Sequence, residues 1–92
     1  MRVDWSPPAV EDLKTIAEWI EQDRDFETAN RIARAIYDAV QSLRTIPYRG
    51  RYGRLENTRE LVVARLPYIV VYQVFKERLI VLNTLHGAQR WP

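Results

Sequence analysis

The chain has 92 residues, enough for one domain (residues 1–92), and its lack of cysteine excludes disulfides and thiolate metal sites. Neither an apolar run of about 20 residues nor a signal-peptide core is present, so we expect a soluble, cytoplasmic protein without metal or cofactor. The net charge of +2 is uneven, because residues 1–46 carry a net −3 and residues 47–92 a net +5. Most of this basic charge is arginine, which favours an anionic partner or ordinary surface solvation.

The first half of the chain predicts a strand and two helices. Residues 2–5 alternate polar and apolar side chains, so they form a short strand that could join a sheet. Ser6 followed by Pro7 is a helix start, and Val10, Leu13, Ile16, Ala17 and Ile20 then make one apolar face. The polar residues 21–25 end this helix.

A second helix is predicted from about Phe26 to the Ile46-Pro47 pair, which stops it. Its apolar residues repeat with the same period, and the link to the first helix is short. We therefore expect an antiparallel helical hairpin, with each helix burying its apolar face on a sheet.

Residues 47–57 follow no period and hold Arg49, Arg51 and Arg54, with Tyr48 and Tyr52 between them. Arginines interleaved with aromatic residues in a loop suit the backbone and bases of a nucleic acid. A solvated loop with its tyrosines folded onto the core explains the same composition.

The last third contains three β-branched apolar runs, residues 61–63, 68–75 and 79–85, separated by breaks too short for anything but hairpins. We predict a three-stranded antiparallel meander. A two-residue turn at Leu66-Pro67 would pair Arg59 with Val74 and place Arg65 opposite Tyr68. The second and third strands are apolar on both faces, so we expect the helices to cover one face and something else, such as a partner chain, to cover part of the other.

Taken together, these elements resemble the RelE/ParE superfamily of toxins from bacterial type II toxin–antitoxin modules. The resemblance covers essentially the whole chain and rests on order and spacing more than on one strong motif. The residues that carry it are Asp12-Leu13, Ile16 and Trp19-Ile20; Ala29, Ile32 and Ile36; Leu43, Pro47 and Gly50-Arg51; residues 58–61; residues 67–74; and residues 85–89.

The resemblance implies an α+β fold, in which an N-terminal strand and an antiparallel helical hairpin pack on a C-terminal antiparallel β-meander. It also implies a cognate antitoxin that wraps and neutralises the toxin. RelE-like members cleave mRNA, many of them on the ribosome, whereas ParE-like members poison DNA gyrase. The fold does not decide between these activities.

The leading hypothesis is a metal-independent mRNA endonuclease, which needs a base, cations around the phosphate and an acid. Our candidate catalytic residues are His86, Arg59 and Arg65, with Glu56 or Glu60 as a possible base. The candidate nucleic-acid-binding residues are Arg49, Arg51, Arg54 and Tyr68. A histidine at a strand end before a glycine can equally cap backbone groups, and Arg59 and Arg65 can be rim charges.

Other hypotheses stay open. The lysine-rich catalytic strand of well-known ribosome-dependent nucleases is absent, because residues 61–63 are Leu-Val-Val. The chain can therefore be a gyrase inhibitor that does not cut RNA, or a degenerate toxin that remains only a structural partner of its antitoxin. In each case we expect an antitoxin contact on exposed apolar surface of the sheet and helices.

Overall fold

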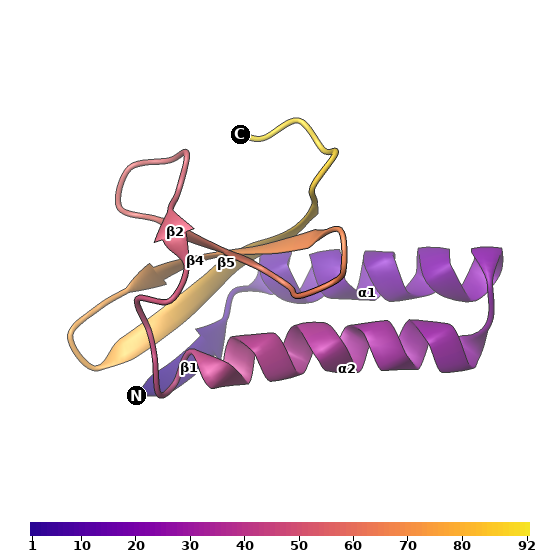
Figure 1. Cartoon of the computed structure of the whole chain (residues 1–92), viewed down its shortest axis with the longest axis horizontal. Coiled ribbons are helices and arrows are strands. Elements are labelled where there is room, and N and C mark those ends of the chain that lie inside the picture. Colours follow the sequence, from indigo (N-terminus) through magenta and orange to yellow (C-terminus); the bar gives the residue numbers. More distant parts are fainter.

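Two helices pack against one face of a five-stranded sheet in the computed structural model, which describes residues 1–92 (Figure 1). The elements in chain order are β1 (Arg2–Trp5), α1 (Pro7–Asp23), α2 (Phe26–Ser42), β2 (Arg51–Tyr52), β3 (Arg59–Val62), β4 (Tyr68–Val74) and β5 (Arg78–His86). This arrangement confirms the predicted α+β fold with its helical hairpin. None of the helices is long and apolar enough to cross a membrane.

The helices begin where the sequence predicts. The Ser6 hydroxyl accepts a hydrogen bond from the Ala9 backbone N–H at 3.2 Å, and Asp25 caps α2 through the Thr28 N–H at 2.6 Å. Two details of the prediction are wrong. Val10 is exposed, since Ala9 takes the buried position beside it, and α2 ends at Ser42, before the Ile46-Pro47 pair.

The strand order is β1-β5-β4-β3-β2. The pairs β5-β4, β4-β3 and β3-β2 are antiparallel, which confirms the meander, and β1 joins β5 in parallel, with Val3 opposite Leu79. The two-residue strand β2 lies inside the segment that the sequence presents as an irregular loop, and it pairs with Arg59 and Glu60.

The predicted register of the first hairpin is wrong by two residues. Arg59 pairs with Tyr72, and the Val63 N–H donates to the Tyr68 carbonyl at 3.0 Å, so residues 64–67 form a four-residue loop. A shift of two residues keeps every side chain on its predicted face. Arg65, however, does not face Tyr68: it lies in the loop with a φ of 64°.

The sheet is buried on both faces, as its apolar strands require. Val70, Tyr72 and Val81 lie in the core with the helices, whereas Ile69, Val71 and Leu85 are buried on the opposite face. The C-terminal tail after β5 turns back across this outer face, on the side away from the helices (Figure 1). Part of the cover that we expected from a partner chain therefore comes from the chain itself.

Candidate functional site

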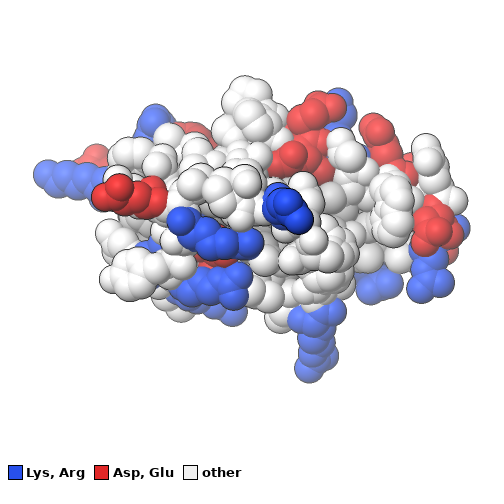
Figure 2. Space-filling view, turned by 90° about the horizontal axis from the view of Figure 1, so that it is seen from above, with Lys and Arg blue, Asp and Glu red and all other residues white.

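The outer face of the sheet, opposite the helices, carries a cluster of basic side chains around Glu60. Figure 2, which looks onto this face, shows Lys and Arg side chains near its middle, with an acidic side chain almost hidden between them. The residues predicted to act on RNA are dispersed: Arg51 and Arg54 lie in this cluster, His86 lies at the far end of β5, and Arg49 and Arg59 lie in neither place.

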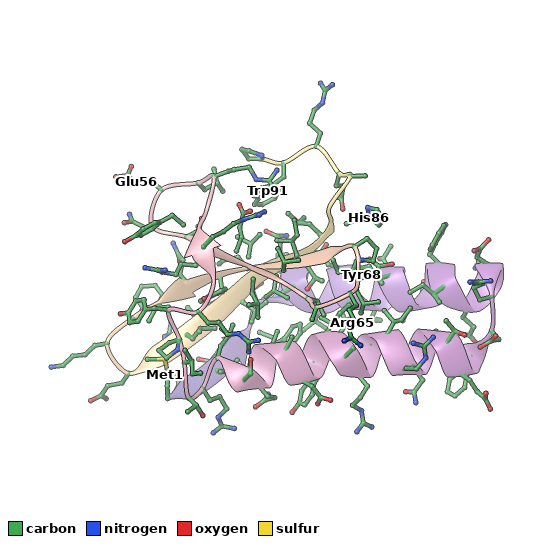
Figure 3. All side chains as sticks on the ribbon, in the orientation of Figure 1. Met1, Glu56, Arg65, Tyr68, His86 and Trp91 are labelled. Carbon is green, nitrogen blue, oxygen red and sulfur yellow. The ribbon has the colours of Figure 1, made fainter.

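His86 lies at the end of β5, opposite Tyr68, and the two rings meet edge to face with centroids 5.5 Å apart (Figure 3). Together with Thr15, Ile16 and Trp19 of α1 they line a mainly apolar hollow of about 300 Å³. Burial raises the pKa of the Tyr68 phenol, which makes that hydroxyl a weaker acid and harder to ionise.

The hydrogen bonds of His86 determine what its ring can do. Its Nδ1 accepts from the Ala88 backbone N–H at 3.0 Å, and its own backbone N–H donates to Gln89 Oε1 at 3.0 Å. A neutral imidazole has one acceptor nitrogen, so this bond leaves the proton on Nε2. His86 thus caps the turn after β5, and its one lone pair is already in use.

Arg59 and His86 lie on different strands, and their partners on β4 are four residues apart. Arg59 pairs with Tyr72, whereas His86 pairs with Tyr68, a separation of about 13 Å along β4. The guanidinium of Arg59 donates through one nitrogen to the carbonyls of Tyr48, at 3.2 Å, and Gly50, at 2.9 Å. The structure therefore does not bring Arg59 and His86 to one reacting group.

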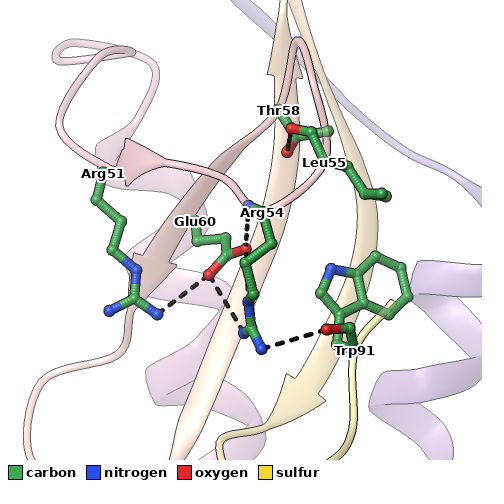
Figure 4. A network of polar contacts seen from close by, with 6 residues as sticks. All are labelled: Arg51, Arg54, Leu55, Thr58, Glu60 and Trp91. Atoms are coloured by element: carbon green, nitrogen blue, oxygen red, sulfur yellow. Dashed lines mark hydrogen bonds and ion pairs between the residues drawn. The ribbon is translucent and has the colours of Figure 1, made fainter.

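Arg51 and Arg54 are bound to a buried carboxylate (Figure 4). The Glu60 side chain is 1% exposed and accepts from the Arg51 guanidinium at 3.1 Å and from Arg54 Nε at 3.2 Å. The Arg54 backbone N–H donates to the same carboxylate at 2.9 Å. These two arginines pair with Glu60, so part of their hydrogen-bonding capacity is used inside the chain.

The pKa of Glu60 reflects this environment. Burial by itself raises the pKa of the carboxyl, but hydrogen bonds from the backbone and side chain of Arg54 and from Arg51 outweigh it, and the pKa lies below its usual range. A carboxylate of lowered pKa with no open face is a poor general base. Glu56 is exposed on the adjoining loop and takes no part in the cluster.

The two remaining candidates, Arg49 and Arg65, lie outside the Glu60 cluster. Arg49 is exposed and donates to the Ser42 hydroxyl at the end of α2, at 3.1 Å. Arg65 lies in the β3–β4 loop, at the same end of the sheet as Tyr68 and His86 (Figure 3). The Glu60 cluster is what the sequence reasoning missed, because it treated Glu60 only as a possible base.

A second buried contact holds the loop that carries these arginines. The Tyr72 hydroxyl is fully buried, accepts from the Gly50 N–H at 2.9 Å and donates to the Pro47 carbonyl at 2.8 Å. Any side chain at position 50 would place its Cβ 2.7 Å from the Tyr72 oxygen, which explains the glycine. The loop is thus fixed to the core at its start and to Glu60 further along.

Comparison with known proteins identifies the family. Residues 3–91 match the family described as "ParE toxin of type II toxin-antitoxin system, parDE". The chain is 38% identical over 91 residues to "Putative toxin Y4kP" of Sinorhizobium fredii, a match that covers 99% of this chain and 93% of that protein. The chain belongs to the ParE toxin family. Its partner is therefore a cognate antitoxin, and the predicted RelE/ParE membership is confirmed.

The solved structures agree on the fold of this ParE-family toxin. A chain of the chromosomal ParDE toxin–antitoxin system from P. aeruginosa superposes with a TM-score of 0.87 at 22% identity, covering 94% of this chain and 95% of that one. At this identity the likeness establishes the fold. The molecular target must be argued from the site itself.

Proposed function

We propose that this ParE-family toxin stops growth by binding DNA gyrase and blocking it, without cutting RNA. The observation that carries the proposal is the separation of the candidate catalytic groups. RNA cleavage needs a base, an acid and a cation at one phosphate. Here His86 and Arg59 are about 13 Å apart along β4, and Glu60 is enclosed by arginines. Of the candidate cations, Arg65 alone lies at the His86 end of the sheet, in the β3–β4 loop.

The hydrogen bonding of His86 supports the same conclusion. A general base that takes the 2′-hydroxyl proton needs a free lone pair, and the only one on neutral His86 accepts from the Ala88 N–H. Tyr68 beside it has a raised pKa because it is buried. The end of β5 therefore resembles a capped turn more than an acid–base pair.

A direct test separates gyrase inhibition from RNA cleavage. The purified toxin and its His86→Asn variant, which keeps a side-chain acceptor but cannot titrate, are assayed for inhibition of gyrase supercoiling. RNA ends are mapped in cells that express each protein. We expect equal inhibition of gyrase by both proteins and no new RNA ends.

New RNA ends that disappear in the His86→Asn variant, with unimpaired supercoiling, would establish the endonuclease alternative. Co-expression of the cognate antitoxin is the control, since it should restore growth whichever target is correct. Expression without a growth defect would refute both activities and indicate a degenerate toxin.

We also propose that the antitoxin contacts exposed apolar side chains of the helical hairpin and of β3. Trp19 and Phe26 are exposed beside the turn between the helices, and Val62 is exposed on β3. Apolar surface of this kind favours a partner helix or strand. Hydrogen exchange on adding the antitoxin should protect these segments, and unchanged exchange there would contradict the assignment.

A further inference from the structure

The Arg59 guanidinium lies between two exposed tyrosine rings. Its central carbon is 4.9 Å from the ring centroid of Tyr48 and 4.4 Å from that of Tyr52. Tyr48 and Tyr52 are 62% and 82% exposed as residues, so most of their surface is open to solvent. With Asn57, Thr58 and Val74 these three residues line a groove of about 260 Å³.

The guanidinium is held in place but only partly used. One terminal nitrogen donates to the Tyr48 and Gly50 carbonyls, while Nε and the second terminal nitrogen have no acceptor within the chain. The stacked rings and the two carbonyls fix the plane of the group before any ligand arrives. A planar pair of N–H donors fits the two oxygens of one carboxylate.

The lining of the groove favours a protein over a nucleic acid. A nucleic-acid backbone is bound by a row of cations, because affinity comes from neutralising successive phosphates. Arg59 is the one cation that lines this groove, since Arg51 and Arg54 are directed at Glu60 and Arg49 at Ser42. The groove therefore offers one free donor pair, which suits a single acidic side chain.

The composition of the surface agrees with a protein partner. Tyrosine, arginine and tryptophan are the residue types most enriched among the few side chains that supply most of the binding energy of a protein–protein interface. Stacked aromatic rings exclude water from a charged contact and strengthen it. Tyrosine side chains also have few rotatable bonds, so little conformational entropy is lost when a partner binds.

We propose that the groove formed by Tyr48, Tyr52 and Arg59 binds an aspartate or glutamate side chain of the gyrase that the toxin blocks. This assignment rests on the proposed function and adds the chemistry of the contact: a bidentate carboxylate on the Arg59 edge, enclosed by the two tyrosine rings.

The test measures the affinity of each toxin variant for the assembled gyrase. Arg59→Lys keeps the charge and loses the planar donor pair, and we expect it to weaken binding about 10- to 100-fold. Tyr52→Ala removes one wall at a position that contributes nothing to the core, and we expect a smaller loss, about threefold to tenfold. The matched control is Arg34→Lys, an exposed arginine on α2 that makes no hydrogen bond or ion pair.

Thermal unfolding and antitoxin affinity are measured on the same variants. We expect both groove variants to bind gyrase more weakly, while Arg34→Lys binding and antitoxin affinity stay unchanged.

Wild-type gyrase affinity in both groove variants would overturn the assignment and leave the proposed function standing. Loss of antitoxin binding alone would overturn it by giving the groove to the antitoxin. RNA cleavage that depends on Arg59 would give it to a nucleic acid. A wild-type toxin that does not bind gyrase would refute the proposed function and this assignment with it.

Discussion

Glu60→Gln should destabilise the toxin strongly although it changes neither shape nor volume. The Glu60 side chain is 1% exposed and accepts from Arg51, from the Arg54 guanidinium and from the Arg54 backbone. The NH₂ group of a glutamine would face N–H groups that now donate to the carboxylate. The two guanidiniums would also lose their counter-charge. Removing one partner of a buried ion pair costs about 3–5 kcal/mol. Both arginine side chains are about half exposed, at 56% and 44%, so we expect about 2–3 kcal/mol at pH 7.

Urea unfolding followed by tryptophan fluorescence measures this loss. For a chain of this length the free energy of unfolding falls by about 1 kcal/mol per molar urea, so the midpoint should move down by about 2–3 M. The melting temperature should fall by about 10–20 °C. Glu56→Gln is the matched control, since it removes a carboxylate from the same segment where nothing binds it, and it should stay within about 0.5 kcal/mol of wild type.

The pH dependence gives the refuting result. The folded pKa of Glu60 is lowered, so its contribution is fully present above the usual range of a free carboxyl and is lost as the pH falls through the lowered pKa. The stability difference between wild type and Glu60→Gln should therefore shrink in acid. A difference under 0.5 kcal/mol at pH 7, or one that grows as the pH falls, would show that the carboxylate does not hold this part of the fold.

Three further substitutions test other contacts, each by urea unfolding of the purified protein. Tyr72→Phe should cost about 1–3 kcal/mol, because it leaves the buried Gly50 N–H without its acceptor, and an unchanged midpoint would contradict that bond. Asp12→Ala should cost about 1–3 kcal/mol, since Asp12 accepts from the Thr84 backbone N–H and so ties α1 to β5; a loss below 0.5 kcal/mol would refute this tie. Arg65→Gly should stabilise the fold by up to about 1 kcal/mol, because Arg65 has a φ of 64°, and destabilisation would show that its side chain contributes more than its backbone costs.

The elements and faces of this fold follow from local sequence patterns. Hydrophobic periodicity and capping residues predict the helix starts, the helical hairpin and the three strands, and both can be read directly from the sequence. The register of the first hairpin cannot be predicted from these patterns, because it depends on the length of the loop. Residues 64–67 form a four-residue loop in place of the predicted two-residue turn. The error of two residues left the predicted faces of these two strands unchanged.

The site was less predictable, since it depends on pairing between segments. Arg51 and Glu60 face each other only because β2 pairs with β3, and a two-residue strand between glycines gives no periodic signal. In sequence the arginines of this loop look like a cationic surface open to phosphate. In the fold Arg51 and Arg54 are directed at one buried carboxylate, and the free donor edge belongs to Arg59 instead.

The Glu60 cluster also explains how a sheet with two apolar faces is covered by a single chain. Arg54 binds Glu60 and donates to the Trp91 carbonyl at 3.5 Å, so one carboxylate connects β3, the preceding loop and the C-terminal tail. The tail in turn crosses the outer face (Figure 1), where Val71 and Leu85 are buried outside the core that the helices share with the sheet. The contact with Arg54 is long, and the buried Trp91 indole N–H has no acceptor, which costs free energy. The tail is therefore the least firmly bound part of this cover, and loss of the Glu60 charge should loosen it first.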